Sequence, residues 1–398
     1  MTHARYAVVM AGGSGTRFWP ASRRHTPKQL LRIAPGSSES LIEATVRRLA
    51  PLCPREHLLI ATGEHLMAAT RAALPQLPPE CFLGEPEARN TAPCIGWAAA
   101  LIAARDPEAV VMVVPSDQHV TDEPAFQRAL SRAVASAASG VITTIGVQPS
   151  RPETGYGYIE LGPEVEGLTE VSLTDHEGAA AGVAEVSLGD HESAPRAAPV
   201  HRVARFVEKP DRSTAEGYLA SGRYVWNAGM FIFRAGDMVA ELRRHLPELS
   251  QGLERLAAAR GSREEAAIAR EVFAAAPSIS IDYGVMERAE RLHVVPAAFG
   301  WSDLGSWESS WELGARDSAG NVAPASAAFV DAERNLVCDL RSDAAAQKGS
   351  PRVVALVGVN DLCVVQTDDA LLVIPRERAQ DVRQVVELLK QRGRADLL

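Results

Sequence analysis

Hydrophobic residues in the first part of the chain form short apolar runs separated by longer alanine-rich stretches. The runs at residues 6–10, 58–61 and 110–114 contain almost no polar residues, which is typical of parallel strands covered on both faces. The stretches at residues 95–105 and 126–138 are rich in alanine and predict helices. Strands that alternate with helices predict an α/β fold with a doubly wound sheet.

The middle of the chain carries more β-strand signals. Residues 156–161, 202–208 and 230–233 predict strands, and helices return over residues 235–276. Between the first two of these strands lies an insertion, residues 162–200, in which the octapeptide Glu-Val-Ser-Leu-x-Asp-His-Glu occurs twice.

The repeated octapeptide permits two interpretations. Its Asp-His-Glu triplets, which contain His176 and His191, consist of residue types that bind metal ions, which is the first interpretation. The surrounding segment is rich in Ala, Gly and Ser, and such a composition favours a tandem duplication in a tolerant surface loop. We therefore expect the insertion to be dispensable.

The last part of the chain shows a third pattern of short strands followed by one helix. A helix begins near Arg376, and its apolar residues recur with the i, i+3, i+4, i+7 spacing of one helix face. We expect this helix to dock on the rest of the chain or on a second subunit. The pattern divides the chain into an N-terminal α/β domain, residues 1–318, and a β-rich C-terminal domain, residues 319–398. The predicted strands are residues 336–340, 353–359, 362–366 and 371–374, and the helix face consists of Val382, Val385, Val386 and Leu389.

The loop after the first strand is the most informative motif. Small residues let backbone N–H groups point at an anion without obstruction by Cβ atoms. Arg17 and Lys28 add positive charge to this loop, which lies at the end of a strand where open α/β sheets bind ligands. The sequence thus favours a phosphate site over a plain tight turn. The loop consists of Ala11, Gly12, Gly13, Ser14, Gly15 and Thr16.

Two better-known phosphate loops do not fit these residues. A Walker loop needs a Gly-Lys pair, and the chain contains none. The dinucleotide-binding fingerprint needs a third glycine where this chain has Phe18. Lysine is also scarce, since it supplies four of the 41 Lys and Arg residues. Lys28 and Lys209 both lie next to proline, which suggests positions where a compact ammonium is needed instead of a planar guanidinium.

Composition restricts the possible partners and location. The net charge of −9 argues against general binding to nucleic acid or to an anionic membrane surface. The five cysteines are widely spaced and odd in number, which favours reduced thiols and a cytoplasmic location. No run reaches membrane-spanning length, and the N-terminal residues do not resemble a signal peptide.

Two aspartates are candidates for binding a metal ion. Asp117 follows the strand at residues 110–114, and Asp303 lies in the Trp-rich segment at residues 300–307. A carboxylate that faces a phosphate loop repels the ligand unless a cation lies between them, and Mg²⁺ is bound in this way. Taken singly, each aspartate fits a helix cap or a turn equally well.

Further polar segments are suited to a sugar or a base. Residues 154–158 and 224–229 combine aromatic side chains, glycines and an amide, which suits a sugar ring, although each segment also fits a β-turn. Residues 89–91 precede a helix, where their polar groups fit a base or ribose, or merely a helix cap. No nucleophile–histidine–acid arrangement stands out, and phosphoryl-type transfer needs none.

As a set, these motifs resemble the mannose-1-phosphate guanylyltransferase family. The resemblance covers nearly the whole chain apart from the insertion, and the length is similar to that of the short, monofunctional members. It implies a Rossmann-like nucleotidyltransferase fold, similar to glycosyltransferase A, with a mixed sheet and helices on both faces. The motifs that carry the resemblance are residues 11–20, 27–29, 89–93, Asp117, residues 208–210, 226–227, 280–283 and 300–307.

The resemblance also implies roles for single residues. Arg17 and Lys28 would neutralise the transition state and the leaving diphosphate, and Lys209 would bind the sugar phosphate. Asp117 and Asp303 would hold Mg²⁺. The loop from Ala11 to Thr16 would bind the triphosphate, Arg89, Asn90 and Thr91 the guanine and ribose, Gly155, Glu208 and Asn227 the mannose hydroxyls, with Asp282 lining the site. In one departure from the family pattern, Gln118 stands where a histidine is usual, and His119 follows it.

The expected reaction converts GTP and α-D-mannose 1-phosphate into GDP-mannose and diphosphate, by in-line attack on the α-phosphorus. A sugar phosphate is largely dianionic at neutral pH and attacks without a general base. The alternatives are another hexose-1-phosphate nucleotidyltransferase and a catalytically silent regulatory homologue that binds a nucleotide sugar. Intact charged residues at the expected catalytic positions speak against the silent homologue. A homodimer through the C-terminal region is a further expectation.

Overall fold

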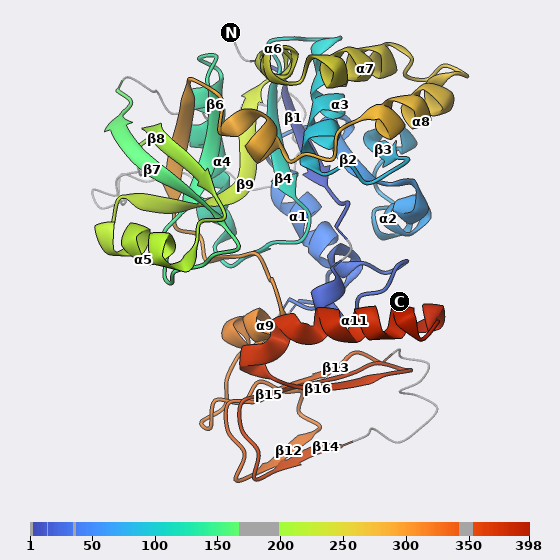
Figure 1. Ribbon diagram of the computed structural model, residues 1–398, viewed down its shortest axis with the longest axis vertical. Coiled ribbons are helices and arrows are strands. Elements are labelled where there is room, and N and C mark those ends of the chain that lie inside the picture. Colours follow the sequence, from blue (N-terminus) through green and yellow to red (C-terminus); the bar gives the residue numbers. More distant parts are fainter. Residues whose placement is uncertain (1–2, 14, 35–36, 167–198, 342–352) are drawn as a thin grey trace, which may run out of the picture.

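The computed structural model describes residues 3–13, 15–34, 37–166, 199–341 and 353–398 (Figure 1). Ser14 lies outside the described residues, as do residues 167–198 with both copies of the repeat. The ends of the insertion are joined by a hydrogen bond of 2.8 Å from the N–H of Val165 to the carbonyl of Val200. The two described ends of the insertion therefore lie side by side.

The large sheet is mixed. Its described strands lie in the order β3-β2-β1-β4-β9-β6-β10-β8-β7. Strands β3, β2, β1 and β4 are parallel, whereas β9 is antiparallel to both β4 and β6. Their bounds are β1 Arg5–Met10, β2 Leu58–Gly63, β3 Phe82–Glu85, β4 Val110–Pro115, β6 Ile142–Val147, β7 Gly157–Glu164, β8 His201–Glu208, β9 Tyr224–Arg234 and β10 Leu292–Ala297.

Helices cover both faces of this sheet because its central strands are apolar on both sides. Successive side chains of a strand point to opposite faces, so Val8 packs in one apolar cluster and Val9 in the other. The face of Val8 is covered by α3 (Thr91–Ala103), α6 (Ala235–His245), α7 (Pro247–Ala258) and α8 (Glu265–Ala275). The face of Val9 is covered by α1 (Leu41–Leu49) and α4 (Glu123–Ala137), with α2 (Met67–Ala73) beside β2.

Strand β9 shows where the predicted elements need correction. The sequence predicts a strand over residues 230–233 and allows a β-turn over residues 224–229. One strand spans both segments, because β9 pairs with β4, β6 and β7 along its length. Gly229 adopts a φ of +67°, which glycine tolerates at no steric cost, beside a register shift between β6 and β9. β7 also pairs with β8, so β9, β6, β10, β8 and β7 close into a ring, with α5 (Arg212–Ser221) beside β9.

The C-terminal part consists of short strands stacked below the large sheet (Figure 1). β12 pairs with β14 and β13 with β15 in parallel, and β15 pairs with β16 in antiparallel. The bounds are α9 Trp307–Leu313, β12 Ala327–Val330, β13 Leu336–Asp339, β14 Val354–Val357, β15 Leu362–Gln366, β16 Leu371–Pro375 and α11 Val382–Gln391.

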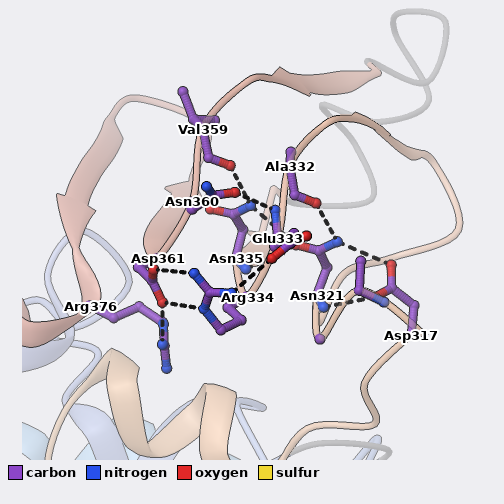
Figure 2. A network of polar contacts seen from close by, with 12 residues as sticks. Asp317, Asn321, Ala332, Glu333, Arg334, Asn335, Val359, Asn360, Asp361 and Arg376 are labelled. Carbon is purple, nitrogen blue, oxygen red and sulfur yellow. Dashed lines mark hydrogen bonds and ion pairs between the residues drawn. The ribbon is translucent and has the colours of Figure 1, made fainter.

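Two buried asparagines hold the turns of this C-terminal part (Figure 2). Asn335 donates to the side-chain oxygen of Asn321 at 3.1 Å and to the carbonyl of Val359 at 3.0 Å. Asn321 in turn donates to the carbonyl of Ala332 at 3.0 Å. Buried backbone groups need such partners wherever strand pairing ends. Nearby, Arg334 and Arg376 both bind Asp361.

Helix α11 packs on the N-terminal domain of its own chain. Its residues Val382 and Val386 are buried in a third apolar cluster that also contains Phe18 and Trp19. The apolar helix face predicted from the sequence thus docks next to the phosphate loop, on the short 3₁₀ turn η1 (Thr16–Phe18). Within the part of the chain that the structure describes, no helix has the length and apolar character needed to cross a membrane.

Candidate active site

The loop after β1 is held by side chains from outside it and by the close approach of Gly15 to Lys28. The carbonyl of Ala11 accepts hydrogen bonds from the Gln29 side chain at 2.7 Å and from the Thr62 hydroxyl at 3.0 Å. Gly15 has a φ of +59°, and a Cβ at this position would lie 2.4 Å from the Cβ of Lys28. Only glycine permits the loop to turn back so close to Lys28.

Lys28 lies at the centre of the site. Its side chain is 7 % exposed, and its ammonium donates to Asp117 Oδ2 at 2.9 Å and to the main-chain carbonyl of Asp303 at 2.6 Å. A buried ammonium requires such partners because desolvation otherwise disfavours its charge. The structure therefore brings together three residues that the sequence analysis selected from distant segments.

Pairing of two very short strands explains why the two aspartates meet. β5 (His119–Val120) directly follows Gln118 and so lies just after Asp117, and β11 (Trp301–Ser302) directly precedes Asp303. These strands pair in antiparallel. Gln118, at the departure from the family pattern, is buried and accepts from the Trp301 indole at 2.9 Å while its amide donates to the carbonyl of Ala228 at 2.8 Å. Gln118 thus joins β11 and β9, and burial lowers the pKa of the neighbouring His119.

The Asp303 carboxylate has a partner that the sequence analysis missed. The hydroxyl of Tyr156 donates to Asp303 Oδ1 at 2.6 Å. The Tyr156 ring packs edge-on against Trp226 and Trp301, with centroids 5.2 and 5.5 Å away. Burial and the nearby Asp303 charge raise the pKa of Tyr156, so the phenol stays a donor. The sequence analysis considered this tyrosine only as an aromatic side chain that suits a sugar ring.

The donor set around Lys28 fits a magnesium ion and not a structural metal cluster. The described residues contain no group of three or more His, Cys, Asp and Glu side chains that could hold a metal. The Lys28 ammonium contacts the Asp117 carboxylate and the main-chain carbonyl of Asp303, and the Asp303 carboxylate accepts from Tyr156. Mg²⁺ is typically held by one or two carboxylates and completes its shell with water and substrate phosphates, so these residues fit it.

Arg17 lies at the same end of the sheet and donates to the carbonyl of Gly305 at 3.2 Å. This bond ties the loop after β1 to the segment that carries Asp303. The short 3₁₀ turn η1 positions Arg17, and the buried Phe18 anchors that turn by packing against Trp307 at a centroid distance of 4.9 Å. The cationic loop is therefore anchored by helix α9, which begins at Trp307.

Asn90 and Thr91 form the start of helix α3. Asn90 adopts a φ of +67° and caps the helix by accepting from the N–H of Thr91 at 2.9 Å. The Thr91 hydroxyl accepts from the N–H of Ile281 at 2.9 Å, next to Asp282. The guanidinium of Arg89 donates to Glu87 at 2.6 Å and to the carbonyl of Ala274 at 3.1 Å. Asn90 therefore caps α3, and all three residues also line the cavity described below, so their expected contact with the guanine and ribose stays a prediction.

The residues expected to bind the sugar come from four segments: Asn227 lies on β9, Glu208 ends β8, Gly155 precedes β7, and Asp282 follows α8. Asn227 donates to Asp282 Oδ1 at 2.9 Å, and burial and the nearby Glu208 raise the pKa of Asp282 to about 6. Glu208 forms an ion pair with Lys209, whose φ is +48°. Gly155 lies in an exposed bend before β7.

One cavity of about 390 Å³ connects these segments. Among the expected site residues, the ones lining it are Gly12, Gly13, Arg89, Asn90, Thr91, Asp117 and Asp282. Arg17, Lys28, Asp303, Asn227, Glu208, Lys209 and Gly155 lie outside its lining. The cavity also contains Glu85, the last residue of β3, which the sequence analysis did not select. A carboxylate directly after an apolar strand was the available signal, as it was for Asp117.

A mixed α/β sheet with a glycine-rich loop, a buried lysine and two aspartates at one edge defines a nucleotidyltransferase. The family described as "Nucleotidyl transferase" matches residues 6–319. The family described as "MannoseP isomerase/GMP-like beta-helix domain" matches residues 334–389, within the C-terminal part.

Individual proteins agree with these family matches. "Xanthan biosynthesis protein XanB" of Xanthomonas campestris pv. campestris (strain B100) is 38 % identical over 98 % of this chain and 74 % of its own length. "Mannose-1-phosphate guanylyltransferase" of Klebsiella pneumoniae is 38 % identical with the same coverage. A solved structure described as mannose-1-phosphate geranyltransferase from Thermus thermophilus is 36 % identical, with a TM-score of 0.77 over 97 % of this chain and 99 % of that chain. The chain belongs to the mannose-1-phosphate guanylyltransferase family.

Proposed function

We propose that the protein transfers the guanylyl group of GTP to α-D-mannose 1-phosphate, giving GDP-mannose and diphosphate. The observation that carries this proposal is the position of Lys28, whose buried ammonium links Asp117 to the Asp303 segment beside the phosphate loop. A non-catalytic binding protein has no need to bury a cation among metal-type ligands, whereas a phosphoryl-type transferase uses such charges in the transition state.

In the proposed reaction, a phosphate oxygen of mannose 1-phosphate attacks the α-phosphorus of GTP. The new P–O bond forms as the bond to the bridging oxygen of the β-phosphate breaks, and diphosphate leaves with that electron pair. Backbone N–H groups of the loop at Gly12 and Gly13, with Arg17 and Lys28, hold the triphosphate and offset the developing charge. The attacking phosphate is already dianionic, so no side chain needs to remove a proton.

The mannose ring is proposed to lie against β9 and the segment after α8. Asn227 and Asp282 are hydrogen-bonded to each other and offer donors and acceptors for sugar hydroxyls. Glu208 Oε2 is buried without a hydrogen-bond partner among the described residues, which suits a hydroxyl donor. Lys209 pairs with Glu208 and is proposed to bind the sugar phosphate, and Gly155 leaves room beside the ring.

Magnesium is the proposed cofactor, with Asp117 and Asp303 as its protein ligands. Bound there, it would neutralise phosphate charge in front of the two carboxylates. Lys28 keeps Asp117 in place, and Tyr156 orients the Asp303 carboxylate. These two contacts prepare the ligand oxygens before substrate binds.

The proposal is tested by product analysis with GTP and mannose 1-phosphate, with and without magnesium. We expect GDP-mannose and diphosphate in equal amounts, and no product in the presence of a chelator. A protein that binds GTP but releases no diphosphate under any divalent cation would contradict the proposal and favour the silent homologue.

We also propose that the protein forms a homodimer through its C-terminal part. A cytoplasmic location is proposed as well. Exposed large hydrophobic side chains gather on β12, β14 and β16, and Val330 and Val357, which are 55 % and 65 % exposed, lie opposite each other. Such surfaces commonly mark interfaces. The five cysteines are free thiols, as expected in a reducing compartment. Light scattering of the V330K/V357K variant should show a monomer where the wild type is a dimer.

A further inference from the structure

Gln118 is a buried residue whose side-chain amide binds two different strands. Its amide nitrogen donates to the main-chain carbonyl of Ala228 on β9 at 2.8 Å, and its oxygen accepts from the indole of Trp301 on β11 at 2.9 Å. A buried amide needs partners of this kind. The two hydrogen bonds also fix β9 and β11 relative to each other at the edge of the site.

Each end of this connection lies next to a residue of the proposed site. The amide belongs to the residue directly after Asp117, the carbonyl that it contacts belongs to the residue directly after Asn227, and the indole lies two residues before Asp303. Residues so close along the chain move together with their neighbours. One side chain therefore fixes the two proposed metal ligands relative to the strand that is proposed to hold the mannose.

Helix α1 holds the main chain around Gln118. The guanidinium of Arg48 donates to the Gln118 carbonyl at 3.2 Å and to the Thr45 hydroxyl at 2.8 Å, and that hydroxyl lies 3.4 Å from the carbonyl of Ser116. Arg48 and Thr45 are both buried, which leaves their side chains little freedom to move. The segment that carries Asp117 is thus braced by α1, so the contacts of the Gln118 amide start from a fixed position.

The indole of Trp301 extends the connection to the Asp303 carboxylate. Its ring packs edge-on against Tyr156 at a centroid distance of 5.5 Å, and the Tyr156 hydroxyl donates to Asp303 Oδ1 at 2.6 Å. Without its hydrogen bond to Gln118, the Trp301 ring is free to turn, and Tyr156 then loses a contact that keeps its hydroxyl on Asp303. Gln118 therefore affects both the place of the Asp303 main chain and the direction of its carboxylate.

We infer that Gln118 is a positioning residue that couples the strand proposed to hold the sugar to the two aspartates proposed to hold the metal ion. This inference rests on the proposed function. In-line attack requires the sugar phosphate and the α-phosphorus of GTP to be aligned, and a shift of about 1 Å lowers the rate by up to about a hundredfold. Gln118 joins the sugar side of the site to the metal side and so maintains this alignment through its neighbours.

Gln118→Met tests the inference because it keeps the length of the side chain and removes both hydrogen bonds. Binding of GTP is measured once with Mn²⁺ and once with a chelator, and neither dissociation constant depends on the fraction of folded protein. We expect the constant with Mn²⁺ to rise about tenfold, as for other contacts that orient metal ligands, and the metal-free constant to stay the same. Gln127→Met, which removes a hydrogen bond of 3.1 Å to the Arg48 carbonyl, is the matched control and should keep both constants.

Steady-state kinetics and a conservative variant give a second readout. In Gln118→Met, kcat should fall by about tenfold to a hundredfold, while KM for mannose 1-phosphate stays close to the wild-type value because the sugar residues remain in place. A neutral imidazole offers one donor and one acceptor, as the glutamine amide does. Gln118→His at pH 8 should therefore recover both the Mn²⁺-dependent binding of GTP and kcat.

An unchanged dissociation constant with Mn²⁺ in Gln118→Met, or an equal rise with and without Mn²⁺, would overturn the inference and leave Gln118 with a structural role only. A Gln118→His variant that is as impaired as Gln118→Met would also overturn it. Absence of diphosphate release by the wild type would instead contradict the proposed function itself, whatever the Gln118 variants do.

Discussion

The indole Nε1 of Trp19 donates a hydrogen bond of 2.8 Å to the main-chain carbonyl of Leu397. The guanidinium of Arg23 donates to the same carbonyl and also to Asp369 at 2.7 Å. The second-last residue of the chain therefore holds the segment that directly follows Arg17. This contact makes the C-terminal part a support for the phosphate loop, in addition to its own packing.

Deletion of residues 395–398 should lower both thermal stability and turnover. The loss of the Trp19 and Arg23 hydrogen bonds should cost about 2 kcal/mol in the free energy of unfolding, since each contributes about 1 kcal/mol. Displacement of Arg17 should lower kcat, by up to about a hundredfold for a shift of about 1 Å. Thermal unfolding and steady-state kinetics measure both effects. Arg394→Ala, which removes only an exposed pair with Asp396, should behave as the wild type, and an unaffected kcat in the deletion would contradict the supporting role.

Lys28→Arg should be nearly inactive although the charge is kept. The Lys28 ammonium fits between two oxygens at 2.6 and 2.9 Å in a buried space beside the Phe18 ring, and a planar guanidinium cannot occupy that space. We expect kcat to fall by about 10²–10³ in a diphosphate-release assay. Lys390→Arg on the exposed side of α11 is the matched control. Wild-type turnover of Lys28→Arg would show that the ammonium geometry is irrelevant.

Asp117→Asn and Asp303→Asn should each raise the magnesium concentration needed for half-maximal activity and lower kcat. An amide is a weaker ligand for a hard cation than a carboxylate. Magnesium titrations of the reaction rate measure the effect. Tyr156→Phe removes only the hydrogen bond to Asp303 and should produce a smaller change. Loss of thermal stability without any change in magnesium dependence would mean that the aspartates are structural.

Glu85→Gln should be more stable than the wild type at pH 8 and equal to it at low pH. Burial raises the pKa of Glu85 to about 7, so the folded state binds a proton more tightly than the unfolded state. The wild type therefore loses stability as the pH rises from about 4.5 to 7, by up to about 3 kcal/mol, whereas glutamine does not titrate. Denaturant unfolding at pH 4.5 and pH 8 measures this difference. A variant that is equally stable or less stable than the wild type at pH 8 would show that the carboxylate has a compensating partner.

Most of the sheet was predictable because its central strands are apolar on both faces. Residues 7–9 and 110–114 are all apolar, so they have no side that could face water, and the pattern indicates buried parallel strands. β10 was not predicted, since Pro296 interrupts a short run that pairing with β6 and β8 makes into a strand. Long-range pairing of this kind leaves no local signal in the sequence.

The sequence allowed site residues to be selected where a side chain with suitable chemistry stands in a recognisable motif or after a predicted strand. Lys28, Asp117 and Asp303 were selected by chemistry, and pairing of β5 with β11 brings the segments of the two aspartates together. The hydroxyl of Tyr156 could not be assigned, because its partner Asp303 lies far away in the chain and only the fold places them 2.6 Å apart. Glu85 was not selected because the short strand that ends there, β3, was not among the predicted strands.

The most direct test of the account is a competition between substrate pairs. Diphosphate release should be measured for GTP with mannose 1-phosphate and for UTP with glucose 1-phosphate, on the same magnesium-loaded enzyme. The account predicts a higher kcat/KM for GTP with mannose 1-phosphate. A higher kcat/KM for UTP with glucose 1-phosphate would contradict it and identify another hexose-1-phosphate nucleotidyltransferase.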